Sequence, residues 1–136
     1  MKTCDRWVMI VEDDLDLRES IAEVLEDNQF RSLGAANGKE AIERLRADTR
    51  RPCVILLDIM MPVMDGWQFR ALQRQDPELG GIPVVVMSAH VDLQRATEGL
   101  APAACLKKPV KLDALLATVQ RFCREPGAGP SDASSA

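Results

Sequence analysis

The sequence is poor in the residues that build zinc sites and disulfide frameworks. Among its 136 residues there is one histidine, and the four cysteines are Cys4, Cys53, Cys105 and Cys123. No two of them form a C-x-x-C pair, so the spacing supports neither a zinc site nor a disulfide framework. We therefore expect the cysteines to be buried, reduced thiols.

An excess of basic charge and long apolar segments are also lacking. The formal net charge is −4, which argues against direct nucleic-acid binding because that function needs a clustered basic face. No apolar segment has the length of a membrane span. Asp5 and Glu12 bracket an N-terminal apolar stretch that is too short for a signal peptide. We expect a cytoplasmic protein that contacts other proteins and no membrane.

The chain does contain four short apolar runs, each followed directly by polar residues. They are Trp7–Val11, Cys53–Leu57, Val84–Met87 and Ala103–Leu106. Runs of this length, rich in aliphatic residues, are typical of strands buried on both faces of a parallel sheet. Segments with a helical period separate them, as in successive βα units.

The complete pattern predicts five strands and five helices, with a weaker strand at Phe30–Ala35. The helices are expected at about Leu15–Asp27, from Asn37 onward, after Gly66, at about Asp92–Leu100, and from about Leu112 to Phe122. Right-handed crossovers, with the weakest strands at the edges, favour a doubly wound, flavodoxin-like α/β fold with a parallel sheet in the order 2-1-3-4-5.

Local signals mark the limits of these elements. Asp14 or Asp16 is expected to cap the first helix, and Asn37 with Glu40 resembles a capping box. Residues 1–124 are expected to form the single domain. Residues 125–136 are rich in proline, glycine and small side chains, which predicts a disordered tail or a truncated linker.

In such a sheet the polar residues after the strands meet at the carboxyl edge, where open α/β sheets bind ligands. They are the acids Glu12, Asp13 and Asp58, the hydroxyl of Ser88 and the ammonium of Lys108. Clustered carboxylates repel one another, and Mg²⁺ relieves this by binding carboxylates, water and phosphate oxygens. With a cation and a lysine nearby, Asp58 is a candidate nucleophile that forms an aspartyl phosphate.

Along roughly residues 6–124 the chain resembles the response-regulator receiver domain of two-component signalling, the CheY-like family. The motifs that carry the resemblance occur in order along the chain. They are Glu12-Asp13, Asp58, Met61-Pro62, Met64-Asp65-Gly66, Ser88-Ala89 and Lys108-Pro109. Lys107 and Lys108 point to opposite faces of a strand, and the family pattern of lysine before proline selects Lys108 for the site.

The resemblance implies that Asp58 accepts a phosphoryl group from a phosphohistidine of a sensor histidine kinase or a histidine phosphotransfer protein. It implies Mg²⁺, with Mn²⁺ as a substitute, held by Asp13, Asp58 and the backbone carbonyl of Met60, with Glu12 acting through water. Ser88 and Lys108 are implied to contact phosphoryl oxygens. These are the site residues that the resemblance assigns.

The resemblance also implies a signalling domain rather than an enzyme. It would catalyse only its own phosphoryl transfer and slow dephosphorylation, and the modification would switch contacts with a downstream protein. The bond between Lys108 and Pro109 is typically cis in this family. His90, two places after Ser88, is either a residue that tunes dephosphorylation or a solvated loop histidine.

Two positions depart from the family pattern. Cys105 stands where many receivers have an aromatic residue whose rotation is coupled to the hydroxyl at Ser88. A thiol has no ring to rotate, so Cys105 is the switch position whose role differs. Pro102, just before the last predicted strand, is also unusual for the family.

Two other readings compete with the phosphorylated receiver. One is a pseudo-receiver that folds but is not phosphorylated and only binds proteins. The other is an aspartate-nucleophile phosphatase of the haloacid dehalogenase type, which needs a second aspartate where this chain has Met60. The chain acts alone, as a phosphorelay intermediate, or as part of a larger protein.

Overall fold

A five-stranded parallel sheet organises the part of the chain that the computed structural model describes, residues 7–89 and 99–123. The strands are β1 (Trp7–Val11), β2 (Arg31–Ala35), β3 (Val54–Asp58), β4 (Val84–Ser88) and β5 (Ala104–Lys107). Their order is β2-β1-β3-β4-β5, which confirms the predicted topology. β3 and β4 end one residue later than predicted, so Asp58 and Ser88 are the last residues of their strands.

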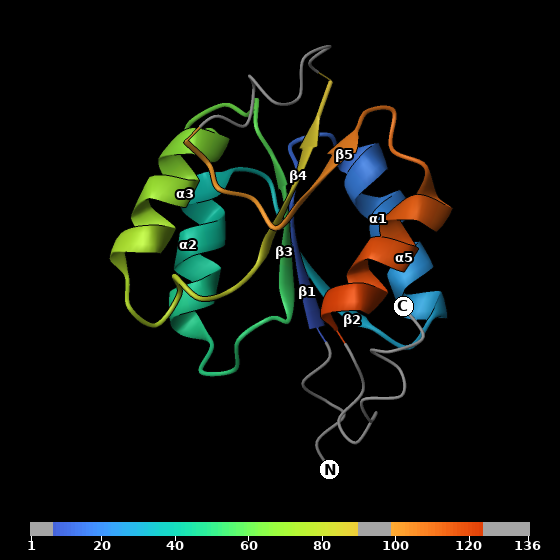
Figure 1. The fold of residues 1–136 in the computed structure, drawn as a ribbon, viewed down its shortest axis with the longest axis horizontal. Coiled ribbons are helices and arrows are strands. Elements are labelled where there is room, and N and C mark those ends of the chain that lie inside the picture. Colours follow the sequence, from blue (N-terminus) through green and yellow to red (C-terminus); the bar gives the residue numbers. More distant parts are fainter. Residues whose placement is uncertain (1–6, 90–98, 124–136) are drawn as a thin grey trace.

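Four helices are described on the two faces of this sheet (Figure 1). They are α1 (Leu15–Asp27), α2 (Gly38–Ala47), α3 (Gly66–Gln75) and α5 (Leu112–Phe122). The helix predicted at Asp92–Leu100 falls largely on residues 90–98, which lie outside the described residues. None of the described helices is long and apolar enough to cross a membrane.

The sheet separates two apolar layers, as its both-face burial predicts. On one side α2 and α3 pack on the side chains of Met9, Ile55 and Val86. On the other side α1 and α5 pack on Ile10 and Val85 (Figure 1). Because successive strand residues point to opposite faces, an uninterrupted aliphatic run serves both layers at once.

Side-chain caps fix the helix starts. Asp14, one of the two predicted caps of α1, accepts a hydrogen bond from the Leu17 N–H at 3.2 Å. At α2 the side chain of Asn37 accepts from the Glu40 N–H at 2.9 Å, but the Glu40 carboxylate accepts from the Ala36 N–H rather than from Asn37. The predicted capping box at α2 is therefore only half formed.

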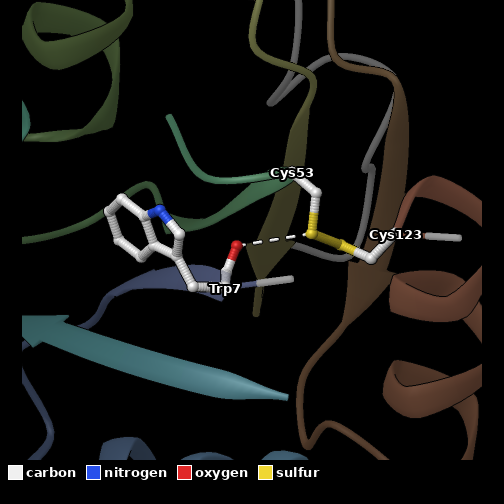
Figure 2. The surroundings of a disulfide bond; sticks show 3 residues. All are labelled: Trp7, Cys53 and Cys123. Atoms are coloured by element: carbon white, nitrogen blue, oxygen red, sulfur yellow. Dashed lines mark hydrogen bonds between the residues drawn. A yellow bond between two sulfur atoms is a disulfide. The ribbon is translucent and has the colours of Figure 1, made fainter. Parts of the chain in front are cut away.

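A disulfide joins Cys53 to Cys123, and the prediction of reduced, buried thiols was wrong for this pair (Figure 2). Cys53 precedes β3 and Cys123 follows α5, and their Cα atoms lie 5.2 Å apart, within the range that a disulfide requires. The two residues are 70 positions apart, and they meet only because α5 packs back across the sheet. Cys105 is a free thiol and is exposed, which also differs from the prediction.

Candidate phosphoacceptor site

The strand register brings three of the predicted site residues to one edge of the sheet. Asp58, at the end of β3, pairs with Met87 in β4, and Ser88, at the end of β4, pairs with Lys107 in β5. Glu12 follows β1 directly, and its N–H donates to the Ala35 carbonyl at the end of β2. All of these positions are carboxyl ends of parallel strands, the edge at which open α/β sheets bind ligands.

Three carboxylates gather at this edge. One oxygen from each of Glu12, Asp13 and Asp58 lies within 4.8 Å of the others. Glu12 is fully buried and Asp58 is 4% exposed, while Asp13 is exposed. The cluster therefore has a buried floor and one carboxylate that faces solvent.

Lys108 provides the positive charge that faces these acids. Its Nζ lies 2.9 Å from Glu12 Oε1 and 3.3 Å from Asp58 Oδ1. Lys107, its neighbour, is exposed and ends β5. The Lys108 N–H donates to the Ser88 carbonyl at 2.8 Å, and the bond between Lys108 and Pro109 is cis.

Burial and charge shift the proton affinities of this pair. Burial, reinforced by the charge of Glu12, raises the pKa of Asp58 from 3.8 to about 7, against the opposing effect of Lys108. Burial by itself lowers the pKa of the Lys108 ammonium, but the close ion pair with Glu12 and the charge of Asp58 outweigh this and raise it. Without a further cation, Asp58 is held only weakly as an anion.

The donor set fits a small divalent cation. Glu12 Oε1 is buried and makes no hydrogen bond of good geometry within the described residues, so the Lys108 ammonium is the charge that compensates it. An Asp58 carboxyl with a raised pKa and an exposed Asp13 carboxylate lie beside it. Mg²⁺ favours a few carboxylates with its remaining positions left to water and phosphate oxygens, which matches this open edge.

The remaining predicted residues differ in how the structure places them. Ser88 is buried at 2% exposure beside β5. Met60, two residues after Asp58, is 62% exposed. Cys105 pairs with Val86 across β4 and β5 and is exposed. His90 lies outside the described residues.

One residue at this edge was missed in the sequence. Arg18, in α1, donates from Nη1 to the backbone carbonyl of Glu12 at 2.6 Å. The only sequence signal is its place four residues after Asp14, the N-cap of α1. That spacing is common in exposed helix faces, so the contact was not predictable from the pattern.

The loop after Asp58 is closed by a tight contact at Gly66. The Gly66 N–H donates to the Ile59 carbonyl at 2.7 Å. Asp65 and Gln68 form a complete capping box that starts α3 directly afterwards. A Cβ at Gly66 would lie 2.8 Å from the Ile59 Cα and 3.0 Å from the Asp58 carbonyl oxygen. The glycine is therefore needed for a close approach of two backbones at the site.

We expect Gly66→Ala to lower the free energy of unfolding by about 1–3 kcal/mol, because the added methyl group meets backbone atoms that cannot move aside cheaply. Gly81→Ala is the matched control, since a Cβ there meets nothing within 4 Å. Urea unfolding of the two variants measures the difference. Equal stabilities would show that the contact at Gly66 relaxes without cost.

Comparison with known proteins shows the family of the chain. A family model described as the response regulator receiver domain matches residues 8–120. The response regulator MprA of Mycolicibacterium vanbaalenii is 33% identical over 133 residues, which cover 93% of this chain and 55% of that protein. The DNA-binding response regulator MtrA of Mycobacterium tuberculosis is 30% identical over 134 residues, which cover 97% of this chain and 57% of that protein.

The fold is shared with solved structures. The chemotaxis protein CheY4 of Vibrio cholerae superposes with a TM-score of 0.78 at 26% identity, over 86% of this chain and 98% of that chain. The chain spans about half the length of the curated relatives it matches. With the family match covering most of its sequence, the chain belongs to the response-regulator receiver domains of two-component signalling.

Proposed function

We propose that Asp58 is the phosphoacceptor of this receiver domain and that its phosphorylation depends on Mg²⁺. The observation that carries the proposal is the placement of Asp58. Its carboxylate is buried at the carboxyl edge of the sheet, 3.3 Å from the Lys108 ammonium and within 4.8 Å of the oxygens of Glu12 and Asp13. A nucleophile between a fixed cation and a cation-binding acid pair suits attack on an anionic phosphoryl group.

Each side chain has a distinct role in this transfer. An Asp58 oxygen attacks phosphorus while the bond from phosphorus to the donor breaks. Lys108 neutralises one phosphoryl oxygen, and the Ser88 hydroxyl donates to another. Asp13, Asp58 and the Met60 carbonyl would hold the metal, with Glu12 acting through water. Bound Mg²⁺ would screen the negative charge that develops on the phosphoryl oxygens.

The donor that suits this site is a phosphohistidine of a sensor histidine kinase or of a histidine phosphotransfer protein. Receivers of this family partner with such kinases, and we propose that the phosphorylated domain then contacts a downstream protein. Part of the length of the curated relatives has no counterpart here, and one of them is a DNA-binding regulator. The receiver itself, at net charge −4, is proposed to act through protein contacts and not by binding nucleic acid.

The phosphatase reading lacks a general acid. The position two residues after Asp58 is Met60, whose side chain cannot deliver a proton to a leaving group. The phosphoryl group is therefore expected to stay on the protein until slow hydrolysis. Its charge at the sheet edge would shift a pre-existing equilibrium between two surface conformations. Cys105 lies at the position where many receivers carry the aromatic switch residue, so this chain would need a different relay.

Intact-protein mass spectrometry after incubation with Mg²⁺ and acetyl phosphate tests the proposal. We expect the mass of one phosphoryl group to be added, and the addition to be abolished by a chelator or by Asp58→Asn. Asp113→Asn, at an exposed position of α5, is the matched control and should be modified like the parent. A folded parent protein that gains no phosphoryl group would favour the pseudo-receiver.

A further inference from the structure

Arg18 makes a hydrogen bond that ties α1 to the turn carrying the acidic residues. Its Nη1 donates to the Glu12 carbonyl oxygen at 2.6 Å. A bond from a charged donor to a backbone carbonyl is stronger than one between neutral groups. The partner is the main chain of Glu12, so the contact fixes backbone rather than a mobile side chain.

The path of the Arg18 side chain depends on a glycine in the neighbouring strand. A Cβ at Gly34, in β2, would lie 2.9 Å from Arg18 Cδ and 3.2 Å from its Nε. The arginine stem therefore crosses β2 at the one residue of that strand without a side chain. The missing Cβ at Gly34 leaves the room through which the guanidinium reaches Glu12.

The bond acts on the peptide that joins Glu12 to Asp13. The Glu12 carbonyl and the Asp13 N–H lie in one rigid plane, so a donor that fixes this carbonyl also fixes the backbone direction at Asp13. The other groups of Glu12 are also held, its N–H by the Ala35 carbonyl at 3.0 Å and its Oε2 by the Asp14 N–H at 3.1 Å. Asp13 itself is exposed between these fixed neighbours.

We propose that Arg18 is a positioning residue that aims the Asp13 carboxylate at the divalent cation. The inference rests on the proposed Mg²⁺ site and adds a residue to it. Arg18 supplies no metal ligand, because a guanidinium only donates hydrogen bonds. It lowers the conformational entropy lost on Mg²⁺ binding, because it already holds the backbone between Glu12 and Asp13 in place in the metal-free protein.

The direction in which Arg18→Met changes the Mg²⁺ affinity distinguishes a positioning role from a purely electrostatic effect. A positive charge near a cation site repels the cation, so if Arg18 acted only through its charge, Arg18→Met would tighten Mg²⁺ binding. A positioning role predicts the opposite. Methionine keeps an unbranched stem beside Gly34 and removes the donor, and we expect the Mg²⁺ dissociation constant to rise about tenfold.

Isothermal titration of Mg²⁺ into the chelator-treated protein tests the inference. Arg31→Met is the matched control, since it removes the same charge from an exposed position at the opposite end of β2, and its affinity should stay within twofold of the parent. Arg18→Lys, which restores a charged donor, should recover most of the lost affinity. Tighter or unchanged binding in Arg18→Met overturns the proposal.

A double-mutant cycle with Gly34→Ala distinguishes a specific loss of the Arg18 contact from a general loss of stability. The added methyl group should push the arginine stem aside and weaken Mg²⁺ binding about threefold when Arg18 is present, and have no effect in the Arg18→Met background. Equal effects in both backgrounds overturn the proposal. Hydrogen exchange in the metal-free protein is a second readout, and the Asp14 amide should exchange about tenfold faster in Arg18→Met.

The parent titration distinguishes this inference from the proposed function. If the parent does not bind Mg²⁺, both proposals are wrong. If the parent binds Mg²⁺ and is phosphorylated while Arg18→Met matches it in affinity, only the role of Arg18 is refuted.

Discussion

Reduction of the disulfide between Cys53 and Cys123 is expected to lower the free energy of unfolding by about 4 kcal/mol, the value that the chain-entropy model gives for a closed loop of this size. The bridge spans 70 positions of sequence, so it removes many conformations from the unfolded chain. For a domain of this size the loss corresponds to a fall of roughly 15 °C in Tm.

The reduced protein is nevertheless expected to keep its fold. Cys53 Sγ lies 3.3 Å from the Trp7 carbonyl oxygen (Figure 2), and a thiol at that place can donate to this carbonyl. Cys123 is buried in the apolar layer between α5 and the sheet, where a reduced cysteine packs as a small hydrophobic residue. Breaking the bridge therefore leaves neither sulfur in an unfavourable environment.

Thermal unfolding with and without dithiothreitol measures the effect. Cys123→Ser should unfold near the temperature of the reduced parent and should not respond to dithiothreitol. Cys105→Ser, which removes the exposed free thiol, should respond like the parent. A parent protein whose Tm is the same under both conditions would show that the bridge contributes nothing to stability.

The sheet was predictable because its signal is local. A short, uninterrupted aliphatic run such as Val54–Leu57 is typical of a strand that is buried on both faces of a sheet. The N-cap of α1 is Asp14, one of the two predicted caps. The disulfide was not predictable, because the spacing of Cys53 and Cys123 in the sequence does not show that the end of α5 lies beside the start of β3. The pairing of these two cysteines depends on tertiary packing, which the spacing does not reveal.

The sequence predicted which residues lie at the strand ends of the candidate site, but not the side-chain contacts that hold their backbone in place. Acids at the carboxyl ends of β1 and β3 had to share an edge once the order of the strands was right. The alternation of Lys107 and Lys108 left one lysine for the site. The contact of Arg18 could not be predicted from the sequence, because an arginine four residues after a helix N-cap normally faces solvent. A hydrogen bond to a backbone carbonyl leaves no residue pattern behind.

A second arginine, Arg70, also donates to backbone carbonyls, on the other side of the sheet. The buried face of α3 contains Phe69, and the polar residues Arg70 and Gln73 are buried there as well. Arg70 donates to the carbonyls of Leu100 and Ala101 at 2.7 and 3.0 Å, and also to Gln73 Oε1 at 2.7 Å. The helix that begins after the Asp58 loop thus also holds the backbone that leads into β5 and Lys108.

The raised pKa of Asp58 makes the free energy of unfolding depend on pH. In the unfolded chain the pKa is near 3.8, and in the folded, metal-free protein it is about 7. Between these values the folded state binds more protons than the unfolded state, so stability falls as pH rises from about 4 to 7. Three pH units correspond to about 4 kcal/mol, an upper estimate for this one group.

We expect Asp58→Asn to raise the free energy of unfolding of the metal-free protein at pH 8 by about 2–4 kcal/mol and to change it little at pH 4, because the amide removes the charge that burial and Glu12 disfavour. Urea unfolding in the presence of a chelator measures both values, and Asp113→Asn should show neither effect. Mg²⁺ should narrow the gap at pH 8 by stabilising the parent. A variant less stable than the parent at pH 8 would mean that Lys108 stabilises the Asp58 carboxylate enough to offset its burial, and that the charge on Asp58 does not lower the stability of the fold.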